Sequence, residues 1–233
     1  MTRTRAALIV SHGQPSDPGP AEEALAQFAA RVAEHLPGWH VGAATLAQPG
    51  ALDAALAAAI EAPRVYPLFM TEGWFTGENL RNRLAGAPDA EILRPLGVSP
   101  HLPALAAERL GREIAQAGWT PGDTRLFLAG HGSGRSGNSA RDTRAFADAL
   151  GALLPLAEIR TGFVEEAPFL ADAARGLGTQ SLCLPFFAAA GGHVVDDIPE
   201  ALDAAGFRGR RLAPLGLAPE VPALVAREIG DRR

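Results

Sequence analysis

The chain has 233 residues, of which 47% are hydrophobic and 20% are charged, an ordinary balance for one large domain or two small ones. Its formal net charge of −5 argues against a general nucleic-acid binder, since such proteins are usually basic. No apolar run approaches the roughly 20 residues of a membrane helix, and residues 6–10 are too short a run for a signal peptide. We therefore expect a soluble cytoplasmic protein that binds neither nucleic acid nor membrane.

Short apolar strands alternate with amphipathic helices along the chain. Strands are expected at residues 5–10, 65–70, 124–129 and 181–187. A helical face is expected at Leu25, Phe28, Val32 and Leu36, and a second one at Phe146, Leu150 and Leu153. The strands are too continuously apolar for a half-exposed sheet. The alternation therefore predicts an α/β fold with parallel sheets covered on both faces.

The sequence repeats itself at an offset near 119 residues. The repeated pairs are His12 and His131 (131 − 12 = 119), Pro49 and Pro168 (119), Pro67 and Pro185 (118), and the segments 96–105 and 215–224 (119). Several anchors in order at nearly one spacing indicate an internal duplication. We predict two similar, flavodoxin-like lobes, residues 1–117 and 118–233, joined by a turn at 118–123.

Three histidines, His12, His131 and His193, follow apolar strands, where parallel sheets place their ligands. His131 has a glycine on each side, and His193 follows a glycine pair. Small neighbours let a ligand approach the imidazole closely. Two histidines in such settings indicate a functional site better than a lone histidine does.

The chain also offers carboxylates and arginines near these histidines. Glu165 and Glu166 follow an apolar strand end, and either of them could be a metal ligand or a base. Histidine with carboxylate suits divalent first-row metals. With Cys183 as its single cysteine, the chain lacks the several thiolates of a closed structural zinc site. Arginines after His131 could recognise carboxylates, and Arg135, in the loop itself, is the best candidate among Arg135, Arg141 and Arg144.

Two hydrolytic motifs are excluded. An α/β-hydrolase nucleophile elbow needs serine at the centre of Gly-x-Ser-x-Gly, whereas His131 stands between Gly130 and Gly132. Histidine phosphatases carry arginine before the His-Gly pair, and this chain has Ser11 or Gly130 there.

These segments together resemble a known family. Ser-His-Gly at 11–13, Gly-His-Gly-Ser at 130–133, Phe-Val-Glu at 163–165 and the long Pro-Phe-Phe-Ala-Ala-Ala-Gly-Gly-His-Val-Val-Asp-Asp-Ile-Pro at 185–199 are similar to the sirohydrochlorin cobaltochelatases and ferrochelatases, the class II tetrapyrrole chelatases. The similarity covers both halves of the chain. It implies a bilobal chelatase fold and insertion of a divalent metal into a tetrapyrrole, in cobalamin or siroheme biosynthesis.

The resemblance also implies the site. The metal-binding and catalytic triad would be His131, Glu165 and His193, all in the C-terminal half. In the N-terminal half, Phe75 stands opposite His193, and the place of Glu165 falls on Leu46 or a near neighbour without an acid. We therefore expect an active C-terminal lobe and a degenerate N-terminal one. His12, Arg135, Trp74 and Phe75 are the expected substrate-binding residues.

The expected substrates are a tetrapyrrole with peripheral carboxylates and a metal ion, Co²⁺ or Fe²⁺, with no organic cofactor. The sequence does not distinguish the metals, since cobalt, iron and nickel accept similar ligands. Two alternatives remain: a non-catalytic tetrapyrrole or metal carrier derived from a chelatase, and a ferrochelatase acting on a haem precursor.

Overall fold

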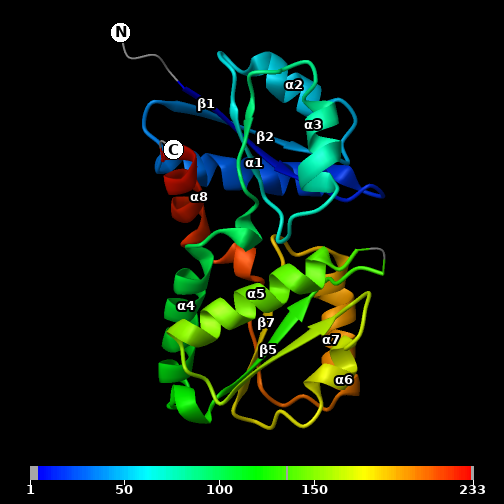
Figure 1. The fold of residues 1–233 in the computed structure, drawn as a ribbon, viewed down its shortest axis with the longest axis vertical. Coiled ribbons are helices and arrows are strands. Elements are labelled where there is room, and N and C mark those ends of the chain that lie inside the picture. Colours follow the sequence, from blue (N-terminus) through cyan, green and yellow to red (C-terminus); the bar gives the residue numbers. More distant parts are fainter. Residues whose placement is uncertain (1–4, 135, 232–233) are drawn as a thin grey trace. The chain divides into compact units, whose positions relative to one another are not determined.

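The computed structural model describes residues 5–134 and 136–231. The chain forms two compact units. The first comprises Met1–Leu96 together with Pro219–Arg233, and the second comprises Gly97–Ala218. Each unit is a parallel sheet with helices packed on it (Figure 1).

The first unit contains a four-stranded parallel sheet in the order β2-β1-β3-β4. Its strands are β1 (Arg5–Ser11), β2 (Trp39–Thr45), β3 (Arg64–Pro67) and β4 (Glu91–Ile92). Its helices are α1 (Pro18–Glu34), α2 (Ala51–Ala58), the π-helix η1 (Phe75–Asn79), α3 (Leu80–Arg83) and α8 (Val221–Gly230).

The second unit repeats this arrangement, with a parallel sheet in the order β6-β5-β7-β8. Its strands are β5 (Arg125–Gly130), β6 (Glu158–Phe163), β7 (Ser181–Pro185) and β8 (Arg210–Arg211). Its helices are α4 (Leu102–Gln116), α5 (Asn138–Leu153), α6 (Leu170–Ala174), the π-helix η4 (His193–Asp197) and α7 (Ile198–Ala204). Short 3₁₀ turns are η2 (Leu96–Val98), η3 (Pro121–Asp123) and η5 (Leu215–Leu217).

The expected α/β fold with duplicated parallel sheets is confirmed. In both sheets the first strand of the copy lies between the second and third, which is the 2-1-3-4 order of flavodoxin-like folds. The central strands are buried along almost their whole length because helices cover both faces. The 3₁₀ turns η2 and η5 lie at corresponding places in the two copies.

The last helix of each sequence copy packs in the other unit. α4 belongs to the first copy by sequence, yet it lies in the second unit and packs against α5. α8 belongs to the second copy and packs against α1 in the first unit (Figure 1). The expected boundary between residues 117 and 118 thus separates the two sequence copies. The chain passes from one compact unit to the other elsewhere, between residues 96 and 97 and again between residues 218 and 219.

The helical faces agree with the expected pattern except at one residue. Leu25, Phe28 and Val32 are buried in α1, and Leu36 is buried just beyond its end. In α5, Phe146 and Leu150 are buried, as expected. Leu153, however, is 55% exposed, because it is the last residue of α5 and no further helical turn shields it from solvent.

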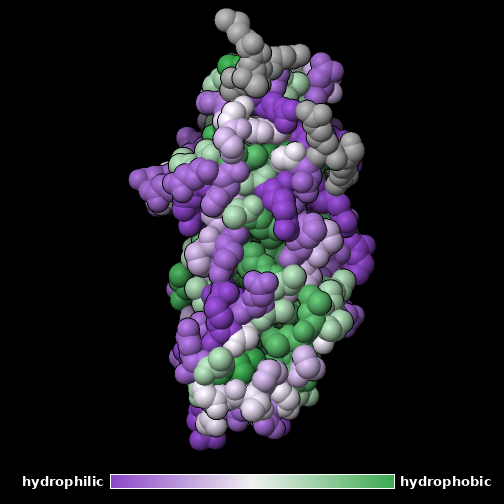
Figure 2. All heavy atoms as spheres, turned by 90° about the vertical axis from the view of Figure 1, so that its left-hand side faces the viewer, coloured by the Kyte–Doolittle hydropathy of each residue, from purple (hydrophilic) through white to green (hydrophobic). Residues whose placement is uncertain are grey.

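Each unit has its own hydrophobic core. In the first, Leu8 and Val10 of β1 pack with Leu52 of α2 and Leu80 of α3. In the second, Phe127 of β5 packs with residues of α6 and α7. Figure 2 shows hydrophilic side chains over much of one face, with apolar ones between them. Within the described residues, no helix is long and apolar enough to span a membrane.

Candidate metal centre

The ends of β5 and β6 place a histidine beside a glutamate. Gly130, the last residue of β5, pairs with Phe163, the last residue of β6. The chain then leaves both strands at the same edge of the sheet, and the Glu165 amide donates a hydrogen bond to the carbonyl oxygen of His131 at 3.0 Å. The main chain therefore holds these two residues together independently of their side chains.

The His131 ring is oriented by its own loop. Its Nδ1 lies 2.9 Å from the carbonyl oxygen of Gly132. Because a carbonyl oxygen only accepts hydrogen bonds, this contact requires the proton on Nδ1 and leaves Nε2 as the nitrogen available to a metal. Gly132 allows this turn because it has a φ of +71°, a conformation that favours glycine.

His193 comes from a different element. It does not directly follow β7, as the sequence suggested, but is the first residue of η4, a π-helix. Its Nδ1 lies 2.5 Å from Oδ2 of Asp197, the last residue of that π-helix. Sequence reasoning assigned no role to Asp197, although the spacing of four residues would have placed it beside His193 on a helix.

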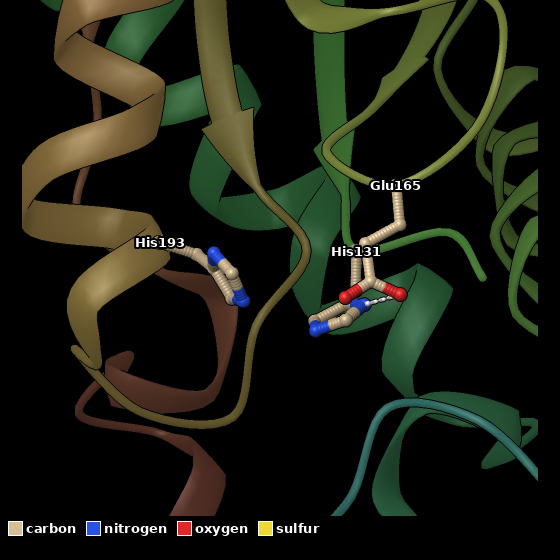
Figure 3. A group of neighbouring side chains, drawn as sticks. All are labelled: His131, Glu165 and His193. Carbon is tan, nitrogen blue, oxygen red and sulfur yellow. Dashed lines mark ion pairs between the residues drawn. The ribbon is translucent and has the colours of Figure 1, made fainter. Parts of the chain in front are cut away.

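The expected triad converges in space. His131, Glu165 and His193 each offer one ligand atom, and these atoms all lie within 4.8 Å of one another. Nδ1 of His131 is 3.8 Å from Oε2 of Glu165, and the two imidazole rings stand edge to face with centroids 4.7 Å apart (Figure 3). The three side chains are 43%, 48% and 40% exposed, respectively, so the group remains open to an incoming ligand.

This donor set fits a labile divalent metal. First-row metals bind imidazole nitrogen and carboxylate oxygen at about 2 Å, so ligand atoms this close require only side-chain rotations to share one ion. Two histidines and one carboxylate also leave coordination positions open. An ion that must enter and leave needs such an incomplete shell.

Of the two neighbouring glutamates, only Glu165 belongs to this group. Oε1 of Glu166 accepts a hydrogen bond from the amide of Ser133 at 2.8 Å. Glu166 also packs against Gly132, where an added Cβ would lie 2.9 Å from its Cγ. Glu166 therefore supports the His131 loop, whereas Glu165 lies beside the His131 ring.

The glycines beside the two histidines have different surroundings. A Cβ on Gly130 would lie 3.1 Å from Oγ1 of Thr143, and one on Gly132 would lie 2.8 Å from Cβ of Phe163. Protein packing by itself thus requires small residues around His131. Beside His193 the position of Gly191 is open, with no atom within 4 Å of an added Cβ.

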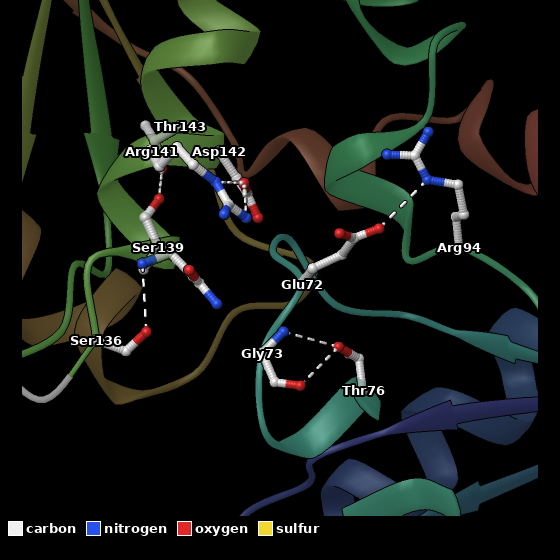
Figure 4. A network of polar contacts seen from close by, with 10 residues as sticks. Glu72, Gly73, Thr76, Arg94, Ser136, Ser139, Arg141, Asp142 and Thr143 are labelled. Carbon is white, nitrogen blue, oxygen red and sulfur yellow. Dashed lines mark hydrogen bonds and ion pairs between the residues drawn. The ribbon is translucent and has the colours of Figure 1, made fainter. Parts of the chain in front are cut away.

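The arginines after His131 have different surroundings. Arg141 in α5 is paired with its neighbour Asp142, Nη2 to Oδ1 at 2.8 Å (Figure 4). Arg144 lies over the ring of Phe163, 5.2 Å from its centroid. Arg135, the preferred candidate, lies outside the described residues.

The first unit contains a mirrored site in which one of the three candidate ligands, the histidine, has a counterpart. Nδ1 of His12 lies 2.9 Å from the Gly13 carbonyl oxygen, as in His131. Phe75, the first residue of η1, stands edge to face to His12 with ring centroids 4.6 Å apart. Phe75 thus occupies the place of His193, as the repeat predicted.

The residue of the first unit that corresponds to Glu165 lies one position later than the 119-residue offset indicates. The amide of Ala47 donates to the His12 carbonyl oxygen at 2.9 Å, just as the Glu165 amide does to His131. The counterpart is therefore Ala47 rather than Leu46, the nearby residue named from the 119-residue offset. Leu46 is buried in the core of the first unit. As expected, neither residue is an acid.

Aromatic side chains surround His12 instead. Trp74 and Phe75 stand edge to face with ring centroids 5.0 Å apart, and Phe69 stacks on Phe75 at 6.5 Å. Trp74 is 57% exposed and Phe75 is 38% exposed, so they are not ordinary core aromatics. Hydrogen bonds between Gly73 and Thr76 fix the turn at the start of η1 (Figure 4).

Cys183 lies apart from these groups, in the core of the second unit. Burial in β7 raises the pKa of its thiol to about 12, and the opposing effect of Arg211 is smaller. Because metals bind the thiolate, a thiol with so high a pKa is a poor ligand at neutral pH.

The chain is similar to known proteins over most of its length. The CbiX family model matches the chain twice, at residues 6–113 and 125–232. A CbiX described as the terminal enzyme for biosynthesis of siroheme in denitrifying bacteria is 48% identical, with a TM-score of 0.88 over 97% of this chain and 98% of that one.

Two more distant proteins are similar as well. A probable sirohydrochlorin cobaltochelatase from Halobacterium salinarum is 24% identical over 237 residues, which cover 84% of this chain and 76% of that protein. The structure of SirB from Bacillus subtilis with Fe³⁺ shares the fold, with a TM-score of 0.75 and 16% identity over 97% of this chain and 94% of its own.

Proposed function

The chain belongs to the CbiX family, and we propose that it inserts a divalent metal ion into sirohydrochlorin with His131, Glu165 and His193 as the metal-binding and catalytic residues. The observation that carries the proposal is the convergence of these three side chains, with ligand atoms within 4.8 Å of one another. They come from three separate elements at one edge of the second sheet. Within residues 5–134 and 136–231, these three side chains are the one group of histidines and acids close enough to share a metal ion.

The histidines bind the metal before it enters the ring. The hydrogen bonds of both Nδ1 atoms leave Nε2 of His131 and Nε2 of His193 as the ligands, and Glu165 adds a carboxylate oxygen. The shell is incomplete, so ring nitrogens replace protein ligands one after another without a fully dissociated ion. The metal is a substrate in this scheme, and it leaves with the product.

Metal insertion also requires that two pyrrole N–H protons leave the ring. His131 and Glu165 lie together, so both a metal ligand and a proton acceptor are present at one point. As the metal moves to the ring, the imidazole and carboxylate it leaves become free to accept these protons. The ring must also be distorted so that its nitrogens are exposed. Contacts between the protein and the rest of the macrocycle offset the energetic cost of this distortion.

The same proposal assigns substrate binding to His12, Trp74, Phe75 and Arg135. The exposed aromatic faces of Trp74 and Phe75 suit an extended flat ring, and an arginine suits the peripheral carboxylates of sirohydrochlorin. Trp74→Ala should raise the KM for sirohydrochlorin about 3- to 10-fold while leaving the affinity for cobalt unchanged. Ile60→Ala removes a comparably exposed apolar side chain from the same unit and is the matched control.

Cobalt and iron are both proposed as metals. Imidazole and carboxylate ligands suit both ions, and the relatives include a probable cobaltochelatase and a terminal enzyme of siroheme biosynthesis. Side-by-side rates with Co²⁺ and Fe²⁺ under anaerobic conditions measure the preference directly.

The deciding experiment follows the absorbance of sirohydrochlorin with Co²⁺ or Fe²⁺, with and without protein. A chelatase accelerates metallation in proportion to its concentration over many turnovers. A carrier binds tetrapyrrole or metal without this acceleration, and that result would refute the enzymatic proposal. Protoporphyrin in place of sirohydrochlorin tests the haem-precursor alternative.

A further inference from the structure

Asp197 contacts His193, one of the two histidines of the candidate metal centre. It is the last residue of η4, and His193 is the first, so the two side chains lie on one side of a single π-helical turn. The distance from Nδ1 of His193 to Oδ2 of Asp197 is 2.5 Å. π-helical turns of this kind occur often at functional sites.

This contact fixes two properties of the imidazole. The carboxylate accepts the Nδ1 proton, so Nε2 is the nitrogen without a proton in the neutral ring, and the contact holds the ring in one rotation about its side-chain bonds. The ring then stands edge to face with His131 at a centroid distance of 4.7 Å. Without this acceptor, the ring would sample both tautomers and several rotamers.

The mirrored site of the first unit supplies an internal comparison. Its π-helix η1 begins at Phe75 and ends at Asn79, the positions of His193 and Asp197. Where the histidine is absent, the carboxylate is absent too. Among the described residues, Oδ1 of Asn79 is buried and has no hydrogen-bond partner. The backbone turn is thus kept in both units, whereas the carboxylate occurs only beneath an imidazole.

We propose that Asp197 is a positioning residue that orients His193 and fixes its tautomer for metal binding. The inference rests on the proposed function, because it assigns His193 to the metal. Asp197 acts through His193 and is not itself a ligand: its Oδ2 is directed to Nδ1, the ring nitrogen on the side away from the metal-binding Nε2.

The test is a titration of the purified full-length protein with Co²⁺ alone, followed by the visible ligand-field absorption of the bound ion. Asp197→Ala and Asp197→Asn should weaken cobalt binding about 10- to 100-fold, the usual cost of losing such a partner. Asp197→Glu, which keeps the carboxylate, should recover part of the loss. Asp196→Asn changes the adjacent exposed carboxylate and should bind cobalt like the wild type.

Kinetics separate a positioning role from a general structural one. In Asp197→Asn the KM for cobalt should rise while the KM for sirohydrochlorin stays constant, and thermal unfolding should remain close to that of the wild type. Asp197→Asn preserves the shape of the side chain, so it serves if Asp197→Ala does not fold. Wild-type cobalt affinity and spectrum in Asp197→Asn and Asp197→Ala would overturn the inference.

The variant His193→Ala tests the proposed metal centre separately from the proposed role of Asp197. Loss of cobalt binding in His193→Ala, together with unchanged binding in the Asp197 variants, would refute the positioning role and leave the metal centre in place. Unchanged binding in His193→Ala would refute the metal centre itself, and the positioning role with it.

Discussion

The two units of this chain have the same backbone at their sites but different side chains. His12 and His131 each direct Nδ1 to the following carbonyl oxygen at 2.9 Å. Each ring meets a partner edge to face, Phe75 at 4.6 Å in the first unit and His193 at 4.7 Å in the second. The first unit shares this local arrangement, whereas among the described residues a set of side chains that could hold a metal ion occurs only in the second.

The side chains that differ between the two units indicate where the proposed function resides. A histidine at a strand end, followed by glycine and oriented by its loop, occurs in both units, so it reflects the fold. The distinguishing residues are Glu165, His193 and Asp197, which correspond to Ala47, Phe75 and Asn79. We therefore propose that function depends on these side chains, since the scaffold that carries them is common to both units.

The largest expected effect comes from copying the first unit into the second. His193→Phe replaces a proposed ligand with the residue at the mirrored position, and it should reduce metallation at least about 100-fold, because even an outer partner of a ligand is worth 10- to 100-fold. The rate of cobalt insertion into sirohydrochlorin measures it. His35→Phe, at the exposed end of α1, is the control. Wild-type rates in His193→Phe would remove the functional contrast between the units.

The reverse exchange should create a second metal centre. The triple variant Ala47→Glu, Phe75→His and Asn79→Asp gives the first unit the side chains of the second around the existing His12. We expect cobalt binding to rise from one equivalent to two, measured by equilibrium dialysis. Combining the triple variant with His193→Ala isolates the new site. A stoichiometry that stays at one would show that the two scaffolds differ in more than these side chains.

A smaller effect should separate stability from metal binding. Gly13 and Gly132 have φ values of +75° and +71°, and an added Cβ would lie 2.7 Å from a carbon of Thr45 and 2.8 Å from one of Phe163, respectively. Gly13→Ala and Gly132→Ala should each destabilise the protein by about 1–3 kcal/mol. Urea unfolding measures this cost. Only Gly132→Ala should also weaken cobalt binding, since it displaces His131.

The smallest effect at neutral pH concerns two buried groups, one in each unit. Burial raises the pKa of Cys183 to about 12, and burial together with Glu228 raises that of Tyr66 well above 10. A group whose pKa is higher in the folded state than in the unfolded state stabilises the fold at any pH below its unfolded-state pKa. This contribution is lost as the pH rises to the folded-state pKa. Stability should therefore fall between about pH 9 and 12, and less so in Cys183→Ala.

A thiol reagent gives an independent reading of the same burial. Cys183 is 1% exposed, so it should react with a disulfide reagent at neutral pH only after unfolding. Rapid labelling of the folded protein would contradict the burial of β7.

The sequence predicted the parts of the fold that are continuously apolar. β1, β5 and β7 are buried along most of their length, so their composition identified them. β2 and β6 lie at the sheet edges, half-exposed through most of their residues, and carry no such pattern. β4 and β8 have two residues each, too few for any periodicity.

The candidate ligands of the site were predicted from the sequence, whereas the contacts that support them were not. The triad came from a motif, and the structure brings its members together. The spacing of four residues would pair Asp197 with His193 on a helix, but His193 was expected directly after a strand, so this contact was missed. The exchange of α4 and α8 was also invisible, since a repeat offset does not state which sheet a helix covers.

That helix exchange sets the order in which the chain completes itself during synthesis. Residues 97–218 form one uninterrupted segment, so the second unit has every part it needs as soon as residue 218 has left the ribosome. The first unit is begun earlier but waits for α8, which is translated after the whole second unit. Until α8 is made, the side of α1 that it covers remains exposed to solvent. Nascent chains are prone to aggregation at such exposed surfaces. The half of the molecule made first is thus the half finished last.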